Sequence, residues 1–224
     1  MNSYQNIQQK LAEFSRKYYA KILMGGSLLF LTLGLLFFFI ILGVEYFLWL
    51  NSTGRLVLLL VFFGVELFLL YRYIFTPLLY LFKIKGGISN KQASVLIGKH
   101  FPDIDDKLYN LLELAEDKEK SELLLASIEQ RSESLKPIPF VKAVDFKENL
   151  KYVKYVGIPL VLFGLVWIGG DIKDFFGSTK RIMNYDLAFE KPAPFAFKLL
   201  SNDLDVLNDK SYTIIFNYPI IKYL

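Results

Sequence analysis

The feature that most constrains this chain is an uninterrupted apolar run from Ile22 to Val44. These 23 residues contain no charged side chain. A helix of that length measures about 34 Å at a rise of 1.5 Å per residue, enough to cross the roughly 30 Å hydrocarbon core of a bilayer. The run ends near Glu45 and Trp49, residue types that are common at membrane interfaces. The sequence therefore predicts a transmembrane helix, with Glu45 and Trp49 as interface anchors.

A second apolar segment runs from about Leu56 to Phe82. It is interrupted by Glu66 near its middle, by Arg72 nearer its far end, and by Pro77. The guanidinium of Arg72 can extend to the interface, so Arg72 is predicted as a third interface anchor, and Pro77 can end or kink the helix. The first two spans are therefore predicted to form a transmembrane helical hairpin over residues 22–82.

Residues 83–151 have the pattern of a soluble helical module. Ser89 and Gln92 fit a capping box, in which each side chain bonds the backbone N–H of the other residue. Apolar residues then recur at helical spacing in three segments: Ala93, Leu96, Ile97 and Phe101; Leu108, Leu111, Leu112 and Ala115; Leu124, Ile128 and Leu135. We expect three short helices around one small core. A third transmembrane helix is predicted after them, at residues 152–170.

Residues 1–21 are predicted to form an amphipathic N-terminal helix. Its apolar residues alternate spacings of three and four: Tyr4, Ile7, Leu11, Phe14 and Tyr18. Such a stripe fits either a short coiled-coil contact or a lead-in helix packed on the bilayer or on the protein's own helices. The stripe covers barely more than two heptads, so the lead-in helix is favoured.

The distribution of cations predicts the orientation of the chain. Lys and Arg gather beside the first span and around the module, whereas Arg55 is the only cation in the short turn of the hairpin. The positive-inside rule then places the N-terminus and the module in the cytoplasm and the residues after Asp171 outside. In a Gram-negative cell that outside is the periplasm. The flanking cations are Lys10, Arg16, Lys17, Lys21, Lys83, Lys85, Lys142, Lys147, Lys151 and Lys154.

Residues 171–224 change character again, to short runs typical of β-strands that are separated by Asn-Asp turns. An immunoglobulin-type sandwich needs about 100 residues, whereas only about thirty remain after Pro194. We therefore expect a periplasmic segment that starts a truncated β-domain, in a fragment of a longer protein. The predicted fold class is mainly α, with three transmembrane helices, a small cytoplasmic helical module and a partial β-sandwich-like C-terminal segment.

Composition excludes several kinds of chemistry. The chain has no Cys and one His, which rules out thiolate nucleophiles, disulfides, Cys-ligated zinc and multi-His metal sites. The net charge of +4 comes from cations beside apolar segments, which indicates membrane orientation rather than nucleic-acid binding. His100 fits a cation on a helix C-terminal dipole, and the acidic residues after it lack the glycine and distal glutamate of an EF-hand. No catalytic, cofactor-binding or metal site is predicted, and no enzyme is expected.

Four stretches carry a resemblance to known sequences. They are Val44 to Leu50 followed by Thr53-Gly54-Arg55, Ile97 to Pro102 with Asp106-Lys107-Leu108, Ser121 to Ile128, and Pro192 to Phe195. Together they resemble the N-terminal region of a family of large bacterial inner-membrane proteins grouped under a domain-of-unknown-function heading. The resemblance extends over nearly the whole chain. It implies a membrane anchor followed by a long periplasmic region, and it implies no particular chemistry.

Glu66 is the residue that most suggests a function. An ionisable group near the middle of a span costs at least about 2.5 kcal/mol on insertion scales, so it should face a partner or water. Three roles are open. The carboxyl group can relay protons or ions, bind a cation on another subunit, or tie its helix to a neighbouring span by a hydrogen bond, for example to a Tyr or Ser hydroxyl.

The expected function is that of a non-enzymatic membrane anchor or scaffold subunit of a bacterial cell-envelope complex. The module is expected to offer a docking surface, and the expected partners are the lipid bilayer and proteins in the membrane and periplasm. The alternative is a transport or secretion-energising membrane subunit that uses Glu66 as an intramembrane carboxylate. No cofactor is expected, and no oligomeric state is predicted.

Overall fold

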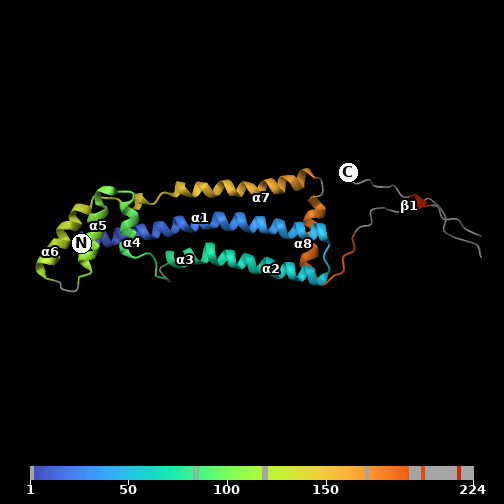
Figure 1. The fold of residues 1–224 in the computed structure, drawn as a ribbon, viewed down its shortest axis with the longest axis horizontal. Helices are drawn as coiled ribbons and strands as arrows, with labels where there is room; N and C mark the ends of the chain where they lie inside the picture. The colour runs from blue at the N-terminus through green and yellow to red at the C-terminus, as the bar shows by residue number, and fades with distance from the viewer. Residues whose placement is uncertain are drawn as a thin grey trace, which may run out of the picture.

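The computed structural model describes residues 3–82, 84, 86–117, 121–169 and 172–191, together with the backbone of 198–199 and 216–217. The described part is mainly helical. Three of its helical segments are long and apolar enough to cross a membrane, namely Ser3–Leu48, Ser52–Leu81 and Phe140–Ile168. Figure 1 shows them as three rods side by side, with the first in the middle. The predicted mainly α fold, with three helical segments able to span a membrane, is confirmed.

Helix α1, Ser3–Leu48, runs without a break through both the module and the bundle of spans. Its 46 residues correspond to a rod of about 69 Å. The amphipathic helix predicted at 1–21 and the span predicted from residue 22 are therefore parts of one continuous helix. The reason is that the helical hydrogen-bond ladder continues whether side chains are polar or apolar. The amphipathic part packs on the protein's own helices.

The helical module forms around the first part of α1. Its helices are α4 (Asn90–Gly98), α5 (Asp105–Ala115) and α6 (Glu122–Leu135), and the capping box of Ser89 and Gln92 is confirmed. The core of the module is one cluster of buried apolar residues from α1, the three module helices, the 3-10 turn Pro102–Ile104 and the connector after α6: Ile7, Leu11, Phe14, Ala93, Ile97, Ile104, Leu108, Leu111, Leu112, Ile128, Leu135, Phe140 and Val144. Three short helices alone do not form this core, because α1 contributes three of its large side chains.

The connector from α6 to the third span is held against α1 by lysines. Lys10 Nζ donates hydrogen bonds to the carbonyl oxygens of Lys136 and Ile138, the latter at 3.1 Å, and Lys17 Nζ donates to the carbonyl of Val141 at 3.0 Å. The connector then forms the short 3-10 turns Phe140–Ala143 and Phe146–Asn149 and leads into α7, Leu150–Ile168. Two cations of the predicted positive flank thus also fix the module to α1.

The second span contains a π-helical turn. Helix α2 is Ser52–Leu70, the π turn is Tyr71–Phe75, and α3 is Thr76–Leu81. Pro77 has no backbone N–H and cannot continue an α-helical ladder. The N–H of Thr76 bonds the carbonyl of Tyr71, a π-type bond that lets the chain pass the proline without ending the span.

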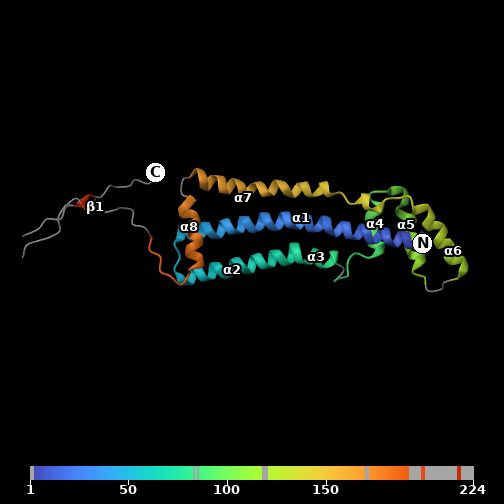
Figure 2. The same cartoon turned by 180° about the vertical axis from the view of Figure 1, so that it is seen from behind.

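Helix α8, Ile172–Met183, crosses the end of the bundle opposite the module and packs against α1, α2 and α7. Figures 1 and 2 show it running across the ends of the three rods. Its buried residues are Phe175, Ser178, Arg181 and Ile182, which share one face of the helix.

The β-sandwich predicted within residues 171–224 is not supported. The segment begins with helix α8, and two-residue strands β1 (Lys198–Leu199) and β2 (Phe216–Asn217) pair antiparallel. The other residues of the predicted strands lie outside the described part of the chain.

Glu129 on α6 caps the first turn of α1. Its carboxylate accepts hydrogen bonds from the backbone N–H groups of Ser3 at 2.6 Å and Tyr4 at 3.3 Å. These bonds, that of Ser3 first, hold the pKa of Glu129 below its ordinary value. Because the folded pKa is lowered, this contribution to stability is present above the unfolded pKa of about 4.3 and is lost as pH falls through the folded value.

We expect the amide resonances of Ser3 and Tyr4 to titrate with a midpoint below about 4.3, since they report the protonation of Glu129. An NMR titration of the protein in detergent measures this midpoint. The variant Glu129→Gln should abolish the titration, and the control Glu122→Gln on the same helix should leave it unchanged. A midpoint at or above the ordinary Glu value would contradict the cap.

Candidate functional site

The end of the bundle near α8 holds a buried cluster of three charged side chains. Glu45, in the last turn of α1, is fully buried. Its Oε1 atom accepts hydrogen bonds from Arg55 Nε at 2.9 Å and from Arg181 Nε at 3.1 Å. The two arginines belong to α2 and α8, so one carboxylate oxygen joins three helices. We refer to Glu45, Arg55 and Arg181 as the charge cluster.

The turn between α1 and α2 places the first two members of the charge cluster. Trp49 has φ 45°, a left-handed conformation that helps to reverse the chain after α1. Asn51 then caps α2, because its side chain accepts a hydrogen bond from the N–H of Gly54 at 2.9 Å. The N–H of Leu50 donates to Glu45 Oε2 at 3.2 Å, so both oxygens of the carboxylate are bound.

Aromatic rings and backbone groups enclose the two guanidinium groups. The Arg181 guanidinium carbon lies 4.0 Å from the centre of the Trp49 ring, and that of Arg55 lies 5.0 Å from the Phe189 ring. Arg181 also donates to Ser178 Oγ at 2.7 Å, and Arg55 Nη1 donates to the carbonyl of Leu187 at 3.3 Å. These contacts meet much of the hydrogen-bonding need of groups that are shielded from water.

The charge cluster holds α1, α2 and α8 together. Charge-assisted bonds that share one acceptor in a dry site fix the geometry of the helices that carry them, and removing the shared carboxylate leaves two buried guanidinium groups without an opposite charge. The chain that leaves α8 is tied to the same site through Leu187 and Phe189. The arrangement therefore fixes both α8 and the start of the following segment relative to the spans.

The sequence pointed to two of these residues in another role. Glu45 and Trp49 were predicted as interface anchors, and the structure places both at the charge cluster, with Glu45 facing inward. The sequence indicates Arg55 only as the cation of the hairpin turn, and no local pattern points to Arg181. The ten-residue separation of Glu45 and Arg55 across a tight hairpin could have suggested their pairing, whereas Arg181 is 136 residues from Glu45.

Glu66 lies on α2 and faces α1. A Cβ atom at Gly34 would lie 2.9 Å from Glu66 Oε2 and 3.1 Å from Oε1, so the carboxyl group packs directly on the glycine backbone. Oε1 is buried and has no hydrogen-bond partner among the described residues. The Tyr or Ser hydroxyl considered as its partner is therefore not found at Oε1 in the described part. The carboxyl group lies between two spans and not on the outer face of α2.

The residues singled out from the sequence do not form one site. Glu45 and Trp49 lie at the α8 end, Glu66 lies within the bundle, and Arg72 lies on the π turn at the module end. Within the described ranges, no group of three or more Asp, Glu or His side chains is placed to hold a metal ion.

Comparison with models of protein families, with curated proteins and with solved structures finds no match for this chain.

Proposed function

We propose that the protein is a non-enzymatic anchor and scaffold subunit of a bacterial cell-envelope complex. The observation that carries this proposal is the continuity of α1, which is the centre of the bundle and also part of the core of the module. A module joined to the membrane by one unbroken helix keeps a fixed position relative to the spans. At the opposite end of the bundle, the charge cluster fixes α1, α2 and α8 relative to one another.

The proposed orientation has the module in the cytoplasm and the α8 end in the periplasm. It is supported by the excess of cations beside the module end of the spans. At the α8 end, Arg55 and Arg181 share the carboxylate of Glu45, which offsets part of the positive charge there. The resemblance to large bacterial inner-membrane proteins agrees with this orientation and stays a prediction.

The orientation is testable because the chain contains no Cys, so a single introduced Cys is labelled uniquely. Leu123 on α6 is 83% exposed, and Asp186 after α8 is exposed. In spheroplasts, a membrane-impermeant maleimide should label Asp186→Cys directly and Leu123→Cys only after permeabilisation. The reverse pattern would overturn the orientation, and labelling of both from one side would show that α7 does not span the membrane.

The scaffold role requires a docking surface, and α6 offers exposed apolar residues for one. Leu123 and Leu125 are exposed, and Leu125 borders a cavity of about 230 Å³ between α1, α5 and α6. Deleting the module would expose the apolar stripe of α1, so a surface variant is the cleaner test. The double variant Leu123→Ser with Leu125→Ser should reduce the mass of the native complex extracted from its own membrane.

The matched control for docking is Gln130→Ser with Arg131→Ser, which changes exposed polar residues of the same helix. It should leave the native mass unchanged. A wild-type protein that runs at the mass of one chain would contradict the scaffold proposal. If the mass of the native complex were unchanged in both double variants, the docking surface would not lie on α6.

A second function, a transport or secretion-energising subunit, is favoured by the buried Oε1 of Glu66 that lacks a partner among the described residues. Such a group can take up and release protons during a cycle. If the anchor proposal holds, Glu66→Gln leaves complex mass and labelling pattern unchanged, because Gln keeps the shape of the side chain. Proteoliposomes with a trapped pH dye should then show no proton flux for the wild type or for Glu66→Gln.

A wild-type proton flux that Glu66→Gln abolishes would replace the anchor proposal by the transport function. The control is Glu148→Gln, which changes an exposed carboxylate in the 3-10 turn before α7. A proton flux that falls equally in Glu66→Gln and Glu148→Gln would not identify Glu66 as the relay. The flux would then need an explanation other than Glu66.

A further inference from the structure

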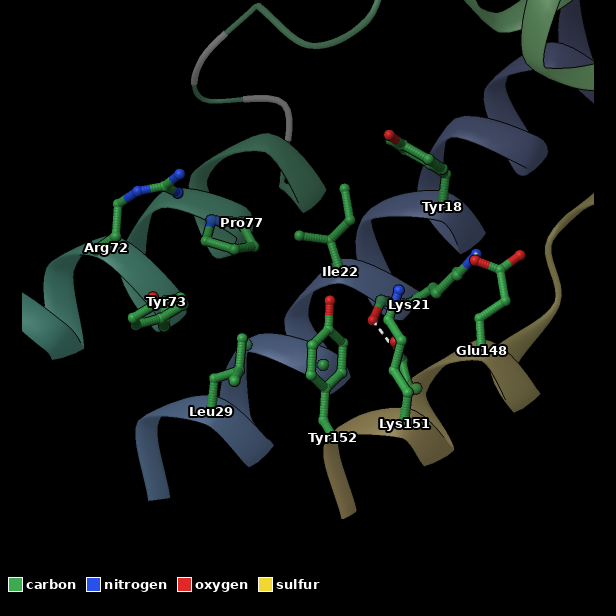
Figure 3. Close-up of a pocket in the computed structure, with 13 residues that line it drawn as sticks. Tyr18, Lys21, Ile22, Leu29, Arg72, Tyr73, Pro77, Glu148, Lys151 and Tyr152 are labelled. Atoms are coloured by element: carbon green, nitrogen blue, oxygen red, sulfur yellow. Dashed lines mark hydrogen bonds and ion pairs between the residues drawn. The ribbon is translucent and has the colours of Figure 1, made fainter. Parts of the chain in front are cut away.

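A cavity of about 280 Å³ opens at the module end of the bundle. Figure 3 shows α1 between its two walls, which are formed by the π turn with α3 on one side and by the start of α7 on the other. The cavity is thus built by all three spans. It is separate from the charge cluster, which lies at the opposite end.

Cations outnumber anions around this cavity. Lys21, Arg72 and Lys151 line it, together with a single carboxylate, that of Glu148. Lys21 Nζ pairs with Glu148 Oε2 at 2.9 Å, which leaves Arg72 and Lys151 as the excess positive charge. The lining therefore attracts an anion.

The two excess cations lie beside aromatic rings on opposite walls. The guanidinium carbon of Arg72 lies 6.0 Å from the centre of the Tyr73 ring, and Lys151 Nζ lies 5.1 Å from the centre of the Tyr152 ring. Figure 3 shows the hydroxyl end of Tyr152 directed toward Ile22 on α1. The site thus combines two cations, one on each wall, with the phenolic side chain of Tyr152.

The lining changes from charged to apolar along α1. Lys21 directly precedes the charge-free run, and Leu29 lines the same cavity eight residues further along the helix. Eight residues correspond to about 12 Å of depth. A ligand that fills the cavity therefore has a negatively charged end at the membrane boundary and an apolar end that extends into the bilayer, which favours an amphiphile over a free anion.

Two glycines on α1 keep the walls close to α1. A Cβ atom at Gly25 would lie 2.8 Å from Asn149 Oδ1, and one at Gly26 would lie 2.3 Å from the carbonyl oxygen of Tyr73. Both glycines line the cavity and contribute no side chain to it. The cavity is therefore a built feature of the contact between α1 and its two neighbours.

We propose that this cavity binds the headgroup of an anionic phospholipid. The anionic headgroup lies between the two walls, with Arg72 on one side and Lys21 and Lys151 on the other, and one acyl chain follows α1 past Leu29. Basic pockets between spans at the membrane boundary suit such headgroups, because each nearby cation adds to the attraction. This site is independent of whether the chain serves as a scaffold.

The test uses the full chain purified in a non-ionic detergent, with native mass spectrometry to count bound lipids. Dioleoylphosphatidylglycerol, dioleoylphosphatidylcholine and inorganic phosphate are added separately. We expect the anionic lipid to bind at least about tenfold more tightly than the zwitterionic lipid, and inorganic phosphate not to compete at millimolar concentration. If inorganic phosphate displaced the anionic lipid, the cavity would be a site for a free anion, and the lipid proposal would be overturned.

The variant Arg72→Gln with Lys151→Gln should weaken binding of the anionic lipid about 25-fold, or about fivefold for each cation. Both side chains are exposed, so the thermal unfolding midpoint without lipid should stay that of the wild type. A loss of lipid together with an unchanged midpoint supports the site. An unchanged affinity overturns it.

Lys154→Gln is the matched control. Lys154 Nζ lies 5.1 Å from the centre of the Tyr155 ring, so this pair repeats the arrangement of Lys151 and Tyr152 three residues further along α7 and outside the cavity lining. It should change affinity by no more than about twofold. A loss as large as that of a single cavity cation would show general attraction to anionic lipid and overturn the proposal.

Discussion

Replacing Glu45 with Gln is expected to lower the free energy of unfolding of the α8 end by about 3–5 kcal/mol. The substitution leaves the side chains of Arg55 and Arg181, which are 2% and 9% exposed, without a carboxylate. A buried guanidinium without an opposite charge keeps the cost of its lost hydration and loses the electrostatic attraction that offsets it. The expected result is release of α8 from the bundle, because Arg181 is the charged contact between α8 and α1.

Hydrogen exchange followed by mass spectrometry, in detergent or nanodiscs, measures this release. The amides of residues 172–183 should exchange faster in Glu45→Gln, while those of α4, α5 and α6 keep their protection, since the module lies at the other end of α1. The control Glu133→Gln removes an exposed partner of Lys136 at 3.8 Å and should cost at most about 0.5 kcal/mol. Unchanged protection of α8 in Glu45→Gln would show that the charge cluster does not hold it.

The second large effect is expected at Gly26. An added Cβ would lie 2.3 Å from the carbonyl oxygen of Tyr73, which belongs to the backbone and cannot turn away. The π turn and α1 must therefore move apart in Gly26→Ala, at a cost of about 1–3 kcal/mol. Titration with sodium dodecyl sulfate, followed by helical circular dichroism, measures the loss of stability.

Gly43→Ala is the matched control, because a Cβ at Gly43 meets nothing within 4 Å and lies on the same helix. It should be neutral or slightly stabilising, since Ala favours a helix over Gly by up to about 1 kcal/mol. Equal stability of the two variants would show that α1 and the π turn adapt to the added methyl group without loss.

Local patterns were enough to predict the apolar helices and the start of the first module helix. A charge-free run of 23 residues and a capping box each consist of residues that are close together in the sequence, so neither depends on the tertiary structure. The polarity of the side chains changes at residue 22, whereas a helix is continued by backbone bonds, so the pattern does not show by itself that one helix carries residues 3–48. Helix α8 was also missed, although Phe175 and Ile182 are spaced by seven residues and share a helical face.

The charge cluster could be predicted only in part. Glu45 and Arg55 meet across a hairpin that the sequence itself indicated, so their pairing was within reach. Arg181 reaches the same carboxylate only because α8 turns back over the ends of the spans, a tertiary arrangement that no local pattern specifies. Glu66 was identified by its cost in a membrane, while its contact with Gly34 depends on how α1 and α2 pack.

The sharing of α1 between module and bundle sets an order of events during synthesis. The apolar side chains of Ile7, Leu11 and Phe14 leave the ribosome early, yet their partners extend to Phe140 and Val144. At 5–20 residues per second, this stripe waits about ten seconds for its core, while both spans of the hairpin are made. During that interval a nearby bilayer surface is the natural cover for an amphipathic helix. We therefore expect the stripe of Ile7, Leu11 and Phe14 to rest first on lipid and to exchange it for protein once α4, α5 and α6 have emerged.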